Sequence, residues 1–377
     1  MPESQVIIFI QTWLIVYACV AYAFTIGKIV PSGKVRSLFI SPVVALLLLL
    51  PLRLTSVFLC ASTALLISWL ATFKLILFSF GKGPLATTYP PITFIRFLAL
   101  GSLPIIPSTK SKDVEKIAEI DNPSTKISRM PVFAMIALVF AMLSYKLLMS
   151  HPDQQLHPTA LFYIYGIAIY LSLQYTVSGF RAMTEAVLGL ELEPLFNDPL
   201  CATSVQNFWG RRWNQAMGKI LRASVYDPVR ALLSPDLGDK HAQRLGVLAT
   251  FVTSGAMHEL IFYYLCRKRP TWKMSWYFLL HGLAVVVEMD VKRRIGQRWR
   301  LPTVVSIILT FSFMSVTSIW LFLPQLYHCD CHVRGAEEFA AFVTFLQSLM
   351  RSTDGSIFSS FLDRVTLSHF LQQLVSY

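Results

Sequence analysis

Charged residues are scarce in this chain of 377 residues, of which only 14% are Asp, Glu, Lys or Arg. Soluble domains carry about 25% charged residues, and the hydrophobic content of 54% excludes an ordinary soluble enzyme. The six cysteines are few and scattered, which excludes the disulfide framework of a small secreted domain. No basic segment precedes the first hydrophobic run, so we expect that run to be a retained signal anchor. The composition indicates an all-α integral membrane protein.

Long apolar runs divide the chain into about eight to nine predicted transmembrane helices, because a spanning helix needs about 20 apolar residues. The runs are 4–27, 37–52, 54–73, part of 84–106, 130–148, 158–180, 245–266, 274–287 and 301–327. Only Arg53 separates the second run from the third, which predicts a tight hairpin or one broken helix. The run 274–287 is short and has basic residues at both ends, which favours a re-entrant segment.

One membrane domain, 1–377, is predicted to contain these helices. It includes a polar loop at 107–129, a cytosol-facing motif region at 181–244 and an amphipathic C-terminal segment at 337–377. The net charge of +12 fits cytoplasmic loops of a membrane protein, and no polar basic domain is present that would bind nucleic acid. A basic mouth would also attract an anionic substrate such as a coenzyme A thioester. Glu3 precedes the first run and lysines follow it, which predicts a lumenal N-terminus.

A single histidine, His258, lies near the middle of the apolar run 245–266. An ionisable residue at this depth is a functional candidate, although a neighbouring helix could instead satisfy it structurally. Ser254 shares its helical face, while Gly255 and Ala256 would allow another helix to approach closely. A neutral imidazole can accept a proton from an alcohol, which is general-base chemistry.

No protein nucleophile accompanies this base. Phe262 stands where a His-Glu-x-x-His zinc motif requires histidine, and no Gly-x-Ser-x-Gly motif occurs. Glu259 points to another side of the helix, where we expect a structural salt bridge. The sequence therefore predicts direct transfer without a metal or a bound cofactor, in which a hydroxyl activated by His258 attacks an activated acyl carbonyl.

The segment 207–214, Asn-Phe-Trp-Gly-Arg-Arg-Trp-Asn, concentrates aromatic, basic and amide side chains in a mostly apolar chain. The predicted substrate-binding residues in this segment and just after it are Trp209, Arg211, Arg212, Trp213, Lys219 and Arg222. Tryptophans suit a membrane interface, and arginines bind phosphates. If the segment continues as a helix, Arg211 and Arg222 share a face and form a basic strip for a nucleotide-bearing thioester. The amide of Asn214 can donate to a developing oxyanion.

These motifs together resemble those of membrane-bound O-acyltransferases of the plant wax-synthase branch. The matching stretches are 202–204, 207–214, Ser-Gly-Ala-Met-His-Glu at 254–259, and His281-Gly282 with Glu288. The resemblance implies that acyl-CoA esterifies a lipophilic alcohol at the endoplasmic reticulum membrane, inside a helical bundle that encloses a reaction tunnel. It places the catalytic histidine at His258 and the motif asparagine at Asn214. Acyl-CoA would enter from the cytosol as co-substrate and the acceptor from the membrane lipid.

Several alternatives stay open beside this interpretation. The family usually has an acidic residue at the position of Asn207, so we expect a changed preference for the acyl donor. A sterol, a triterpenoid or diacylglycerol could replace the long-chain alcohol. A proton-coupled transporter is a remote alternative that would need acidic residues along several spans and an inverted repeat. The sequence indicates no oligomeric state.

Three further residues are predicted to line the tunnel or support the site: Ser254, His281 and Glu288. His281 and Glu288 share a helical face, and Glu288 needs a partner such as Arg293 or a group on another helix, because carboxylates in membranes are rarely unpaired. The segment 328–332 has the composition of a metal site, but its spacing strains tetrahedral coordination. We expect a solvated turn there.

Overall fold

The computed structural model describes residues 3–86, 92–105, 107, 189, 192–296 and 301–331, with parts of 166–187 and 333–344. Within these ranges the regular secondary structure is helical, apart from one isolated bridge between Pro107 and Leu192. The predicted loop at 107–129 and the predicted run 130–148 lie outside the described residues, as does most of 158–180 and of the segment 337–377.

Six helices in the described ranges are long and apolar enough to cross a membrane. They are Ser4–Ile29, Lys34–Arg53, Val57–Ser79, Asp239–Cys266, Lys273–Ile295 and Thr303–His328. Each of them corresponds to one predicted run, which confirms a multi-pass helical membrane protein.

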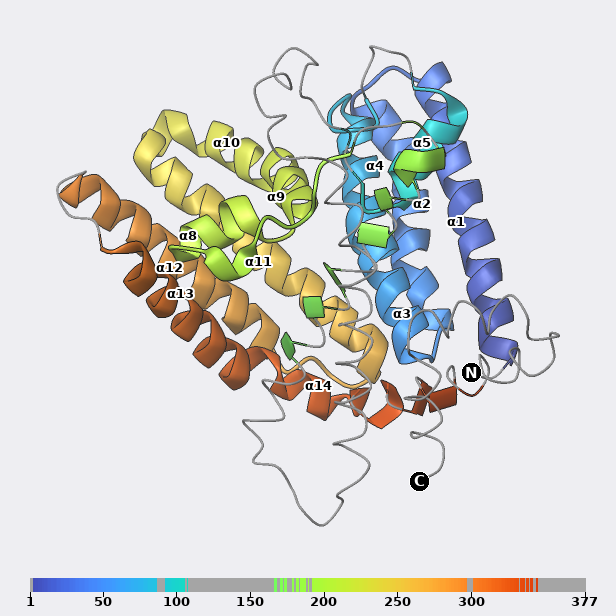
Figure 1. Ribbon diagram of the computed structural model, residues 1–377. Helices are drawn as coiled ribbons and strands as arrows, with labels where there is room; N and C mark the ends of the chain where they lie inside the picture. The colour runs from blue at the N-terminus through green and yellow to red at the C-terminus, as the bar shows by residue number, and fades with distance from the viewer. Residues whose placement is uncertain are drawn as a thin grey trace.

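The helices form an N-terminal and a C-terminal group, and the short motif helices lie mostly beside the second group (Figure 1). The first group contains α1 (Glu3–Ile29), α2 (Lys34–Leu49), a long helix built from α3 (Val57–Thr63), a π-helical segment (Ala64–Ala71) and α4 (Thr72–Ser79), and α5 (Phe94–Ser102). The second contains α11 (Asp239–Cys266), α12 (Lys273–Ile295), and α13 (Thr303–Thr317), which continues through a π-helical segment (Ser318–Phe322) towards α14 (Pro324–His328). The segment between the two groups in the sequence contains α8 (Val205–Asn207), a π-helical turn (Phe208–Arg212), α9 (Gln215–Leu221), a second π-helical turn (Arg222–Tyr226) and α10 (Asp227–Leu237).

The second and third predicted runs form a hairpin rather than one broken helix. A short 3-10 turn, Leu50–Arg53, follows α2, and the Ser56 side chain caps α3 by accepting a hydrogen bond from Leu59 N at 3.2 Å. At the other end, Gly33 N donates to Ser79 O at 2.8 Å. The start of α2 therefore lies beside the end of α4, and the two helices run antiparallel.

Helix α12 has 23 residues and is longer than the predicted run 274–287. A helix of 23 residues is long enough to cross a bilayer, so the re-entrant segment expected at 274–287 is not needed. The basic residues before it serve as hydrogen-bond donors to helix ends. Arg267 donates to three backbone carbonyl oxygens at the turn after α2, at 2.9 to 3.2 Å, and Lys268 donates to His328 O at 2.8 Å.

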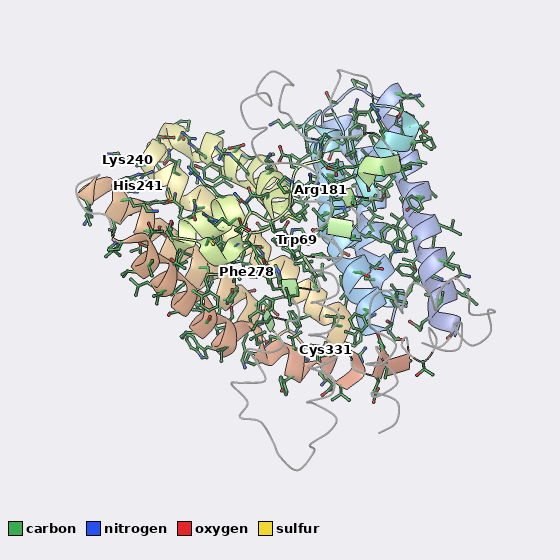
Figure 2. All side chains as sticks on the ribbon, viewed as in Figure 1. Trp69, Arg181, Lys240, His241, Phe278 and Cys331 are labelled. Carbon is green, nitrogen blue, oxygen red and sulfur yellow. A yellow bond between two sulfur atoms is a disulfide. The ribbon has the colours of Figure 1, made fainter. Side chains whose placement is uncertain are left out.

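A disulfide between Cys266 and Cys329 joins the end of α11 to the end of α14. Nothing in the scattered cysteines indicated this bond, because it joins two helix ends that lie 63 residues apart in the sequence. Cys331, labelled in Figure 2, lies at the same end of the molecule. Burial raises the pKa of the Cys331 thiol to about 11. The disulfide removes Cys329 from the thiolates that the segment 328–332 could offer to a metal.

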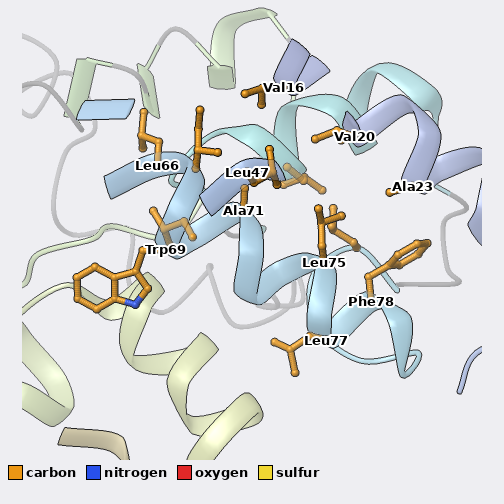
Figure 3. Close-up of a cluster of buried hydrophobic side chains, with 14 of the residues drawn as sticks. Val16, Val20, Ala23, Leu47, Leu66, Trp69, Ala71, Leu75, Leu77 and Phe78 are labelled. Carbon is orange, nitrogen blue, oxygen red and sulfur yellow. The ribbon is translucent and has the colours of Figure 1, made fainter. Parts of the chain in front are cut away.

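A tightly packed core holds the N-terminal group together (Figure 3). Val16, Val20 and Ala23 repeat at helical spacing on one face of α1, and all three are fully buried. They belong to one cluster with Leu47 of α2 and Leu75 of α4. This packing gives the site described below a fixed wall on its N-terminal side.

A buried lysine, Lys74, is accommodated inside this group without a carboxylate in the described chain. Its Nζ donates to the carbonyl oxygens of Leu100, Leu103 and Ile105 at 2.7, 2.7 and 3.2 Å. These carbonyls lie at the end of α5 and just beyond it, where backbone acceptors lack helical partners and where the helix dipole favours a cation. Lys74 therefore fixes α5 against α4.

Candidate active site

His258 lies on α11 at the seam between the two helix groups. Its ring packs edge-on against Trp69 of the N-terminal group, with the ring centroids 4.6 Å apart. On the C-terminal side it faces Phe278 of α12, at 4.3 Å, and Phe322 at 6.2 Å. The side chain is half-buried, so aromatic rings from three elements surround a histidine that keeps some accessible surface.

The hydrogen bonding of His258 shows which ring nitrogen carries the proton. Nδ1 lies 2.8 Å from the backbone carbonyl oxygen of Ser254. A carbonyl oxygen can only accept, so Nδ1 carries the hydrogen. Nε2 then has a free lone pair, and nothing in the described part of the chain is hydrogen-bonded to it. This neutral tautomer can accept a proton at Nε2.

The second histidine of the region, His281, is fully buried and has both nitrogens occupied. Trp209 Nε1 donates to its Nδ1 at 3.0 Å, so Nε2 carries the hydrogen and donates to Thr317 Oγ1 at 2.9 Å. Thr317 donates in turn to Phe313 O at 2.7 Å. This closed chain leaves His281 no free lone pair, so it positions the motif tryptophan and α13.

The segment 207–214 is not the continuous helix that the basic-strip hypothesis required. Its π-helical turn ends at Trp213, whose φ of −96° and ψ of 129° are extended. Asn214 follows with a left-handed φ of 41°, which Asn adopts more readily than most residues. A new helix, α9, starts after Asn214. Arg211 and Arg222 therefore lie on different elements, and the prediction that they share a helical face is wrong.

Asn214 uses only one end of its amide within the protein. Its Oδ1 accepts a hydrogen bond from Met217 N at 3.2 Å and caps α9. Nδ2 has no hydrogen-bond partner among the described residues. The backbone turn and the cap therefore fix the side chain and leave an N–H donor available, which is the arrangement that an oxyanion needs.

Asn207 and Arg212 hold the motif turn closed. Arg212 Nε donates to Asn207 Oδ1 at 2.7 Å, and Thr203 N donates to the same oxygen at 3.3 Å. Nη1 of Arg212 donates to the carbonyl oxygens of Asn197 and Asp198 at 3.2 and 2.9 Å. A carboxylate at position 207 could accept both of the hydrogen bonds that Asn207 accepts. Asn207 thus keeps the acceptor and removes the negative charge.

The other predicted phosphate-binding side chains differ in how free their charge is. Lys219 forms an ion pair with Glu193, and Arg222 Nε lies 3.7 Å from the Asp227 carboxylate. Arg211 is exposed and has neither a hydrogen bond nor an ion pair in the ranges that the structure describes. The guanidinium of Arg211 is therefore the most available of these groups for a phosphate.

The two motif tryptophans pack against protein rings. Trp209 lies 5.8 Å from Phe251 of α11 and 5.7 Å from Phe278 of α12. Trp213 stacks on Phe208 with centroids 5.4 Å apart. Because Phe278 also contacts His258, the motif turn and the histidine share one aromatic wall.

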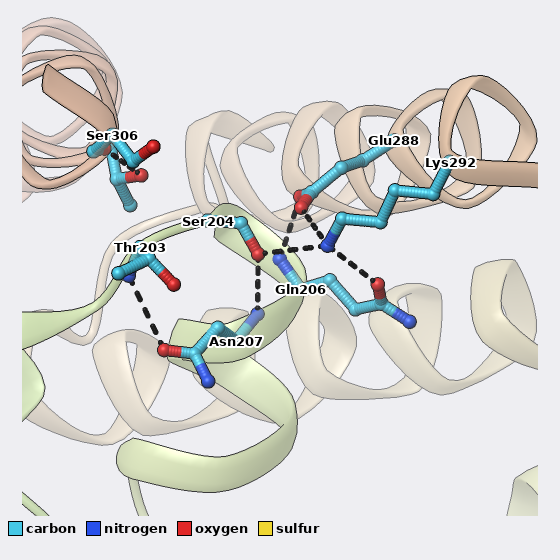
Figure 4. A network of polar contacts seen from close by, with 8 residues as sticks. Thr203, Ser204, Gln206, Asn207, Glu288, Lys292 and Ser306 are labelled. Carbon is cyan, nitrogen blue, oxygen red and sulfur yellow. Dashed lines mark hydrogen bonds and ion pairs between the residues drawn. The ribbon is translucent and has the colours of Figure 1, made fainter. Parts of the chain in front are cut away.

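A polar network ties the motif to α12 (Figure 4). Glu288 Oε2 accepts from the backbone N–H of Gln206 at 2.9 Å. Lys292 Nζ donates to Ser204 Oγ at 3.2 Å and to Gln206 Oε1 at 3.1 Å, and it pairs with Glu288. The partners of Glu288 are therefore Lys292 and the backbone N–H of Gln206, which lies on another helix, and not Arg293. Glu288 therefore anchors the motif segment to α12.

Glu259 caps α12 instead of forming the expected salt bridge. Its buried Oε1 accepts from the backbone N–H groups of Met274 and Ser275 at 3.0 and 3.2 Å. The first N–H groups of a helix lack internal partners, and the positive end of the helix dipole favours a carboxylate. The residue next to His258 therefore sets the position of α12 relative to α11.

Close approach of α11 and α12 occurs at Gly255 and not at Ala256, which is exposed. A Cβ atom on Gly255 would lie 2.9 Å from the Cα of Ser275. We expect Gly255→Val to push α12 away, to shift Phe278 from His258 and to lower kcat about 10²-fold, because small misplacements at reacting groups have effects of this size. Ester synthesis in microsomes measures it. Ala256→Val adds bulk on the exposed face and should stay within about twofold, so an equal loss in both variants would contradict this interpretation.

Comparison with known proteins places the same segment in a family. Residues 192–280, which include both Asn214 and His258, match the membrane bound O-acyl transferase family. The chain is 38% identical over 350 residues to acyl-CoA–sterol O-acyltransferase 1 of Arabidopsis thaliana, which covers 93% of this chain and 99% of that protein. It is 36% identical over 349 residues to the long-chain-alcohol O-fatty-acyltransferase of Simmondsia chinensis, with 92% and 97% covered. It is 37% identical over 328 residues to probable long-chain-alcohol O-fatty-acyltransferase 3 of Arabidopsis thaliana, with 86% and 91% covered.

Proposed function

The chain belongs to the membrane-bound O-acyltransferase family, in the branch of the plant wax synthases, and from this premise we propose that it transfers an acyl group from acyl-CoA to the hydroxyl of a lipophilic alcohol. The observation that carries the proposal is the His258 ring, whose Nδ1 is held by Ser254 O while Nε2 has no partner in the described chain. Relatives with 36% and 37% identity are named for long-chain alcohols, which favours such an acceptor.

The proposed reaction assigns proton transfer to His258 and charge stabilisation to Asn214. Nε2 of His258 takes the hydroxyl proton as the alcohol oxygen attacks the thioester carbonyl carbon. The Asn214 amide donates to the oxyanion that forms. The C–S bond then breaks, and His258 returns the proton to the thiolate of coenzyme A. The reaction needs no metal and no bound cofactor beyond the co-substrate.

The proposed orientation has the motif segment on the cytosolic side of the endoplasmic reticulum membrane. The network around Glu288 holds the motif at the C-terminal end of α12, whereas the Cys266–Cys329 disulfide lies near its N-terminal end. Disulfides persist in the oxidising lumen, which supports this arrangement. Acyl-CoA would then meet Arg211 at the mouth of a tunnel in a bundle of eight to nine spans.

A sterol acceptor is the second candidate. The relative with 38% identity is named as an acyl-CoA–sterol O-acyltransferase, and the acceptor depends on the shape of the tunnel rather than on the proton-transfer residues. The base and the oxyanion donor would act in the same way on a sterol hydroxyl.

Expression in a yeast strain that lacks its own neutral-lipid acyltransferases tests both candidates. Cells are fed long-chain alcohols or sterols, and the esters are identified by mass spectrometry. We expect wax esters to dominate over steryl esters. A dominance of steryl esters would select the second candidate, and a membrane-located protein that makes neither product would contradict the proposed function.

A further inference from the structure

Trp69 carries a buried hydrogen-bond donor without an acceptor. The side chain is 3% exposed, and its Nε1 has no hydrogen-bond partner among the residues that the structure describes. A buried indole N–H usually has a partner, because a donor that loses water without a replacement is costly. Trp209 shows the usual case, since its Nε1 donates to His281. The free donor of Trp69 suggests an acceptor that arrives with the substrate.

The position of Trp69 points to the same conclusion. Its ring meets the ring of His258 edge-on, with an interplanar angle of 82°, so the indole lies in direct contact with the candidate base. In Figure 3 it lies at one edge of the N-terminal core, well away from Ala23 and Phe78 at the opposite edge. Trp69 therefore belongs to the N-terminal helix group and lies beside the candidate base.

A second unpaired indole N–H in the described chain provides a contrast. It belongs to Trp13 of α1, whose ring neighbours are Phe9 and Tyr17 of the same helix, at 6.0 Å each. Trp13 has no ring contact with His258. An unpaired indole is thus found twice in membrane-spanning helices, and only one of the two borders the candidate base.

The backbone around Trp69 is also unusual. Residues Ala64–Ala71 form a π-helical segment, in which the N–H of Thr72 bonds to Ile67 O five residues back. Such segments are rare and frequently occur at functional sites. The wider turn changes the direction of the side chains that follow it relative to the core face of α3. The π-helical segment therefore includes Trp69, the residue that contacts His258.

We propose that Trp69 is a second oxyanion donor, whose Nε1–H donates to the acyl carbonyl oxygen as that oxygen becomes negative. The inference rests on the proposed acyl transfer. Of the two substrate oxygens near His258, only the carbonyl oxygen gains charge in the transition state. The hydroxyl oxygen attacks with its lone pair, so a donor placed on it would weaken the nucleophile. The indole N–H only donates, which restricts Trp69 to stabilisation.

The bonds of this step balance without any further reactant. A C–O bond forms, the C–S bond breaks, and the hydroxyl proton passes through Nε2 of His258 to the departing thiolate. Trp69 contributes a hydrogen bond and transfers no proton. Together with the free Nδ2 of Asn214, which caps α9, it would supply two donors from two separate helices.

Trp69→Phe keeps an aromatic ring against His258 and removes the donor. We expect kcat for ester synthesis to fall about 10²-fold, which is typical for the loss of one oxyanion donor, with KM for the alcohol within about twofold. Trp13→Phe is the matched control, because it also removes an unpaired indole N–H from a spanning helix, and it should stay within about twofold of the wild type. An unchanged kcat in Trp69→Phe would overturn the proposal.

Two inert analogues of acyl-CoA separate hydrogen bonding from packing. One is a ketone with a methylene between sulfur and carbonyl carbon, and the other is a thioether without a carbonyl. Trp69→Phe should weaken the ketone about tenfold and leave the thioether unchanged. The ratio of the two dissociation constants does not depend on the folded fraction. Equal weakening would assign Trp69 to packing alone. A wild-type protein that makes no ester would refute the proposed function instead, and the ratio would still be measurable.

Discussion

Replacing His258 with alanine is expected to lower kcat for ester formation about 10³-fold, within the range that general-base catalysis contributes. Nε2 of His258 is the only histidine lone pair of this site without a partner in the described chain, because His281 donates and accepts at once. Alanine leaves the alcohol without a proton acceptor at the reacting carbon. The membrane location should persist, since the side chain makes its single hydrogen bond to its own helix.

The measurement is ester synthesis in microsomes, normalised to the amount of protein in the membrane fraction. His241→Ala serves as the control, because His241 lies exposed near the start of the same helix. Figure 2 shows it well away from Phe278 of α12, which packs against His258. We expect the control to retain activity. Ester synthesis by His258→Ala at the level of this control would exclude the proposed mechanism.

Three π-helical segments contribute rings to the aromatic wall of the site: Trp69 and Phe322 contact His258, and Trp209 contacts Phe278. The first carries Trp69, the second carries Trp209, and the third ends at Phe322. The first and the third interrupt long helices beside His258. π-helical insertions are frequent at functional sites. Four such segments occur in the described chain, and three of them contribute to this one region.

The spanning helices were predictable because a bilayer demands long apolar runs, but their ends were not. Helix α11 begins at Asp239, six residues before the predicted start, and α12 extends past Glu288 to Ile295. The polar extensions support each other: Arg244 of α11 pairs with Asp290 of α12 at 2.9 Å. Hydropathy detects the apolar centre of each helix. It does not detect charges that are neutralised by a neighbouring helix.

The candidate base was predictable for a similar reason, since an ionisable residue inside an apolar run is expensive. Trp69 was not, because a tryptophan in such a run resembles any other core residue until its unpaired N–H is seen. The break at Trp213 escaped prediction as well. It depends on the left-handed backbone of Asn214, whereas the expected basic strip required a helix that continued through this position.

Asn214→Asp is expected to lower kcat about 10²- to 10³-fold while the fold is retained. Aspartate can adopt the left-handed conformation at position 214, and its carboxylate can accept the hydrogen bond from Met217 N that caps α9. The substitution removes the Nδ2 donor and places a negative group where the oxyanion forms. The loss should therefore appear in kcat, with the thermal unfolding midpoint within a few degrees of the wild type.

Asn207→Asp is the matched control, because it makes the same chemical change in the same motif. The side chain of Asn207 contributes only an acceptor oxygen, to Thr203 N and Arg212 Nε, and a carboxylate preserves both contacts. We expect its kcat to stay within about twofold, and its profile over acyl-CoA chain lengths tests whether the missing charge alters donor choice. If Asn214→Asp kept the activity of this control, the amide would be a helix cap alone. The oxyanion would then depend on other donors, and a loss confined to Trp69→Phe would identify the indole as the principal one.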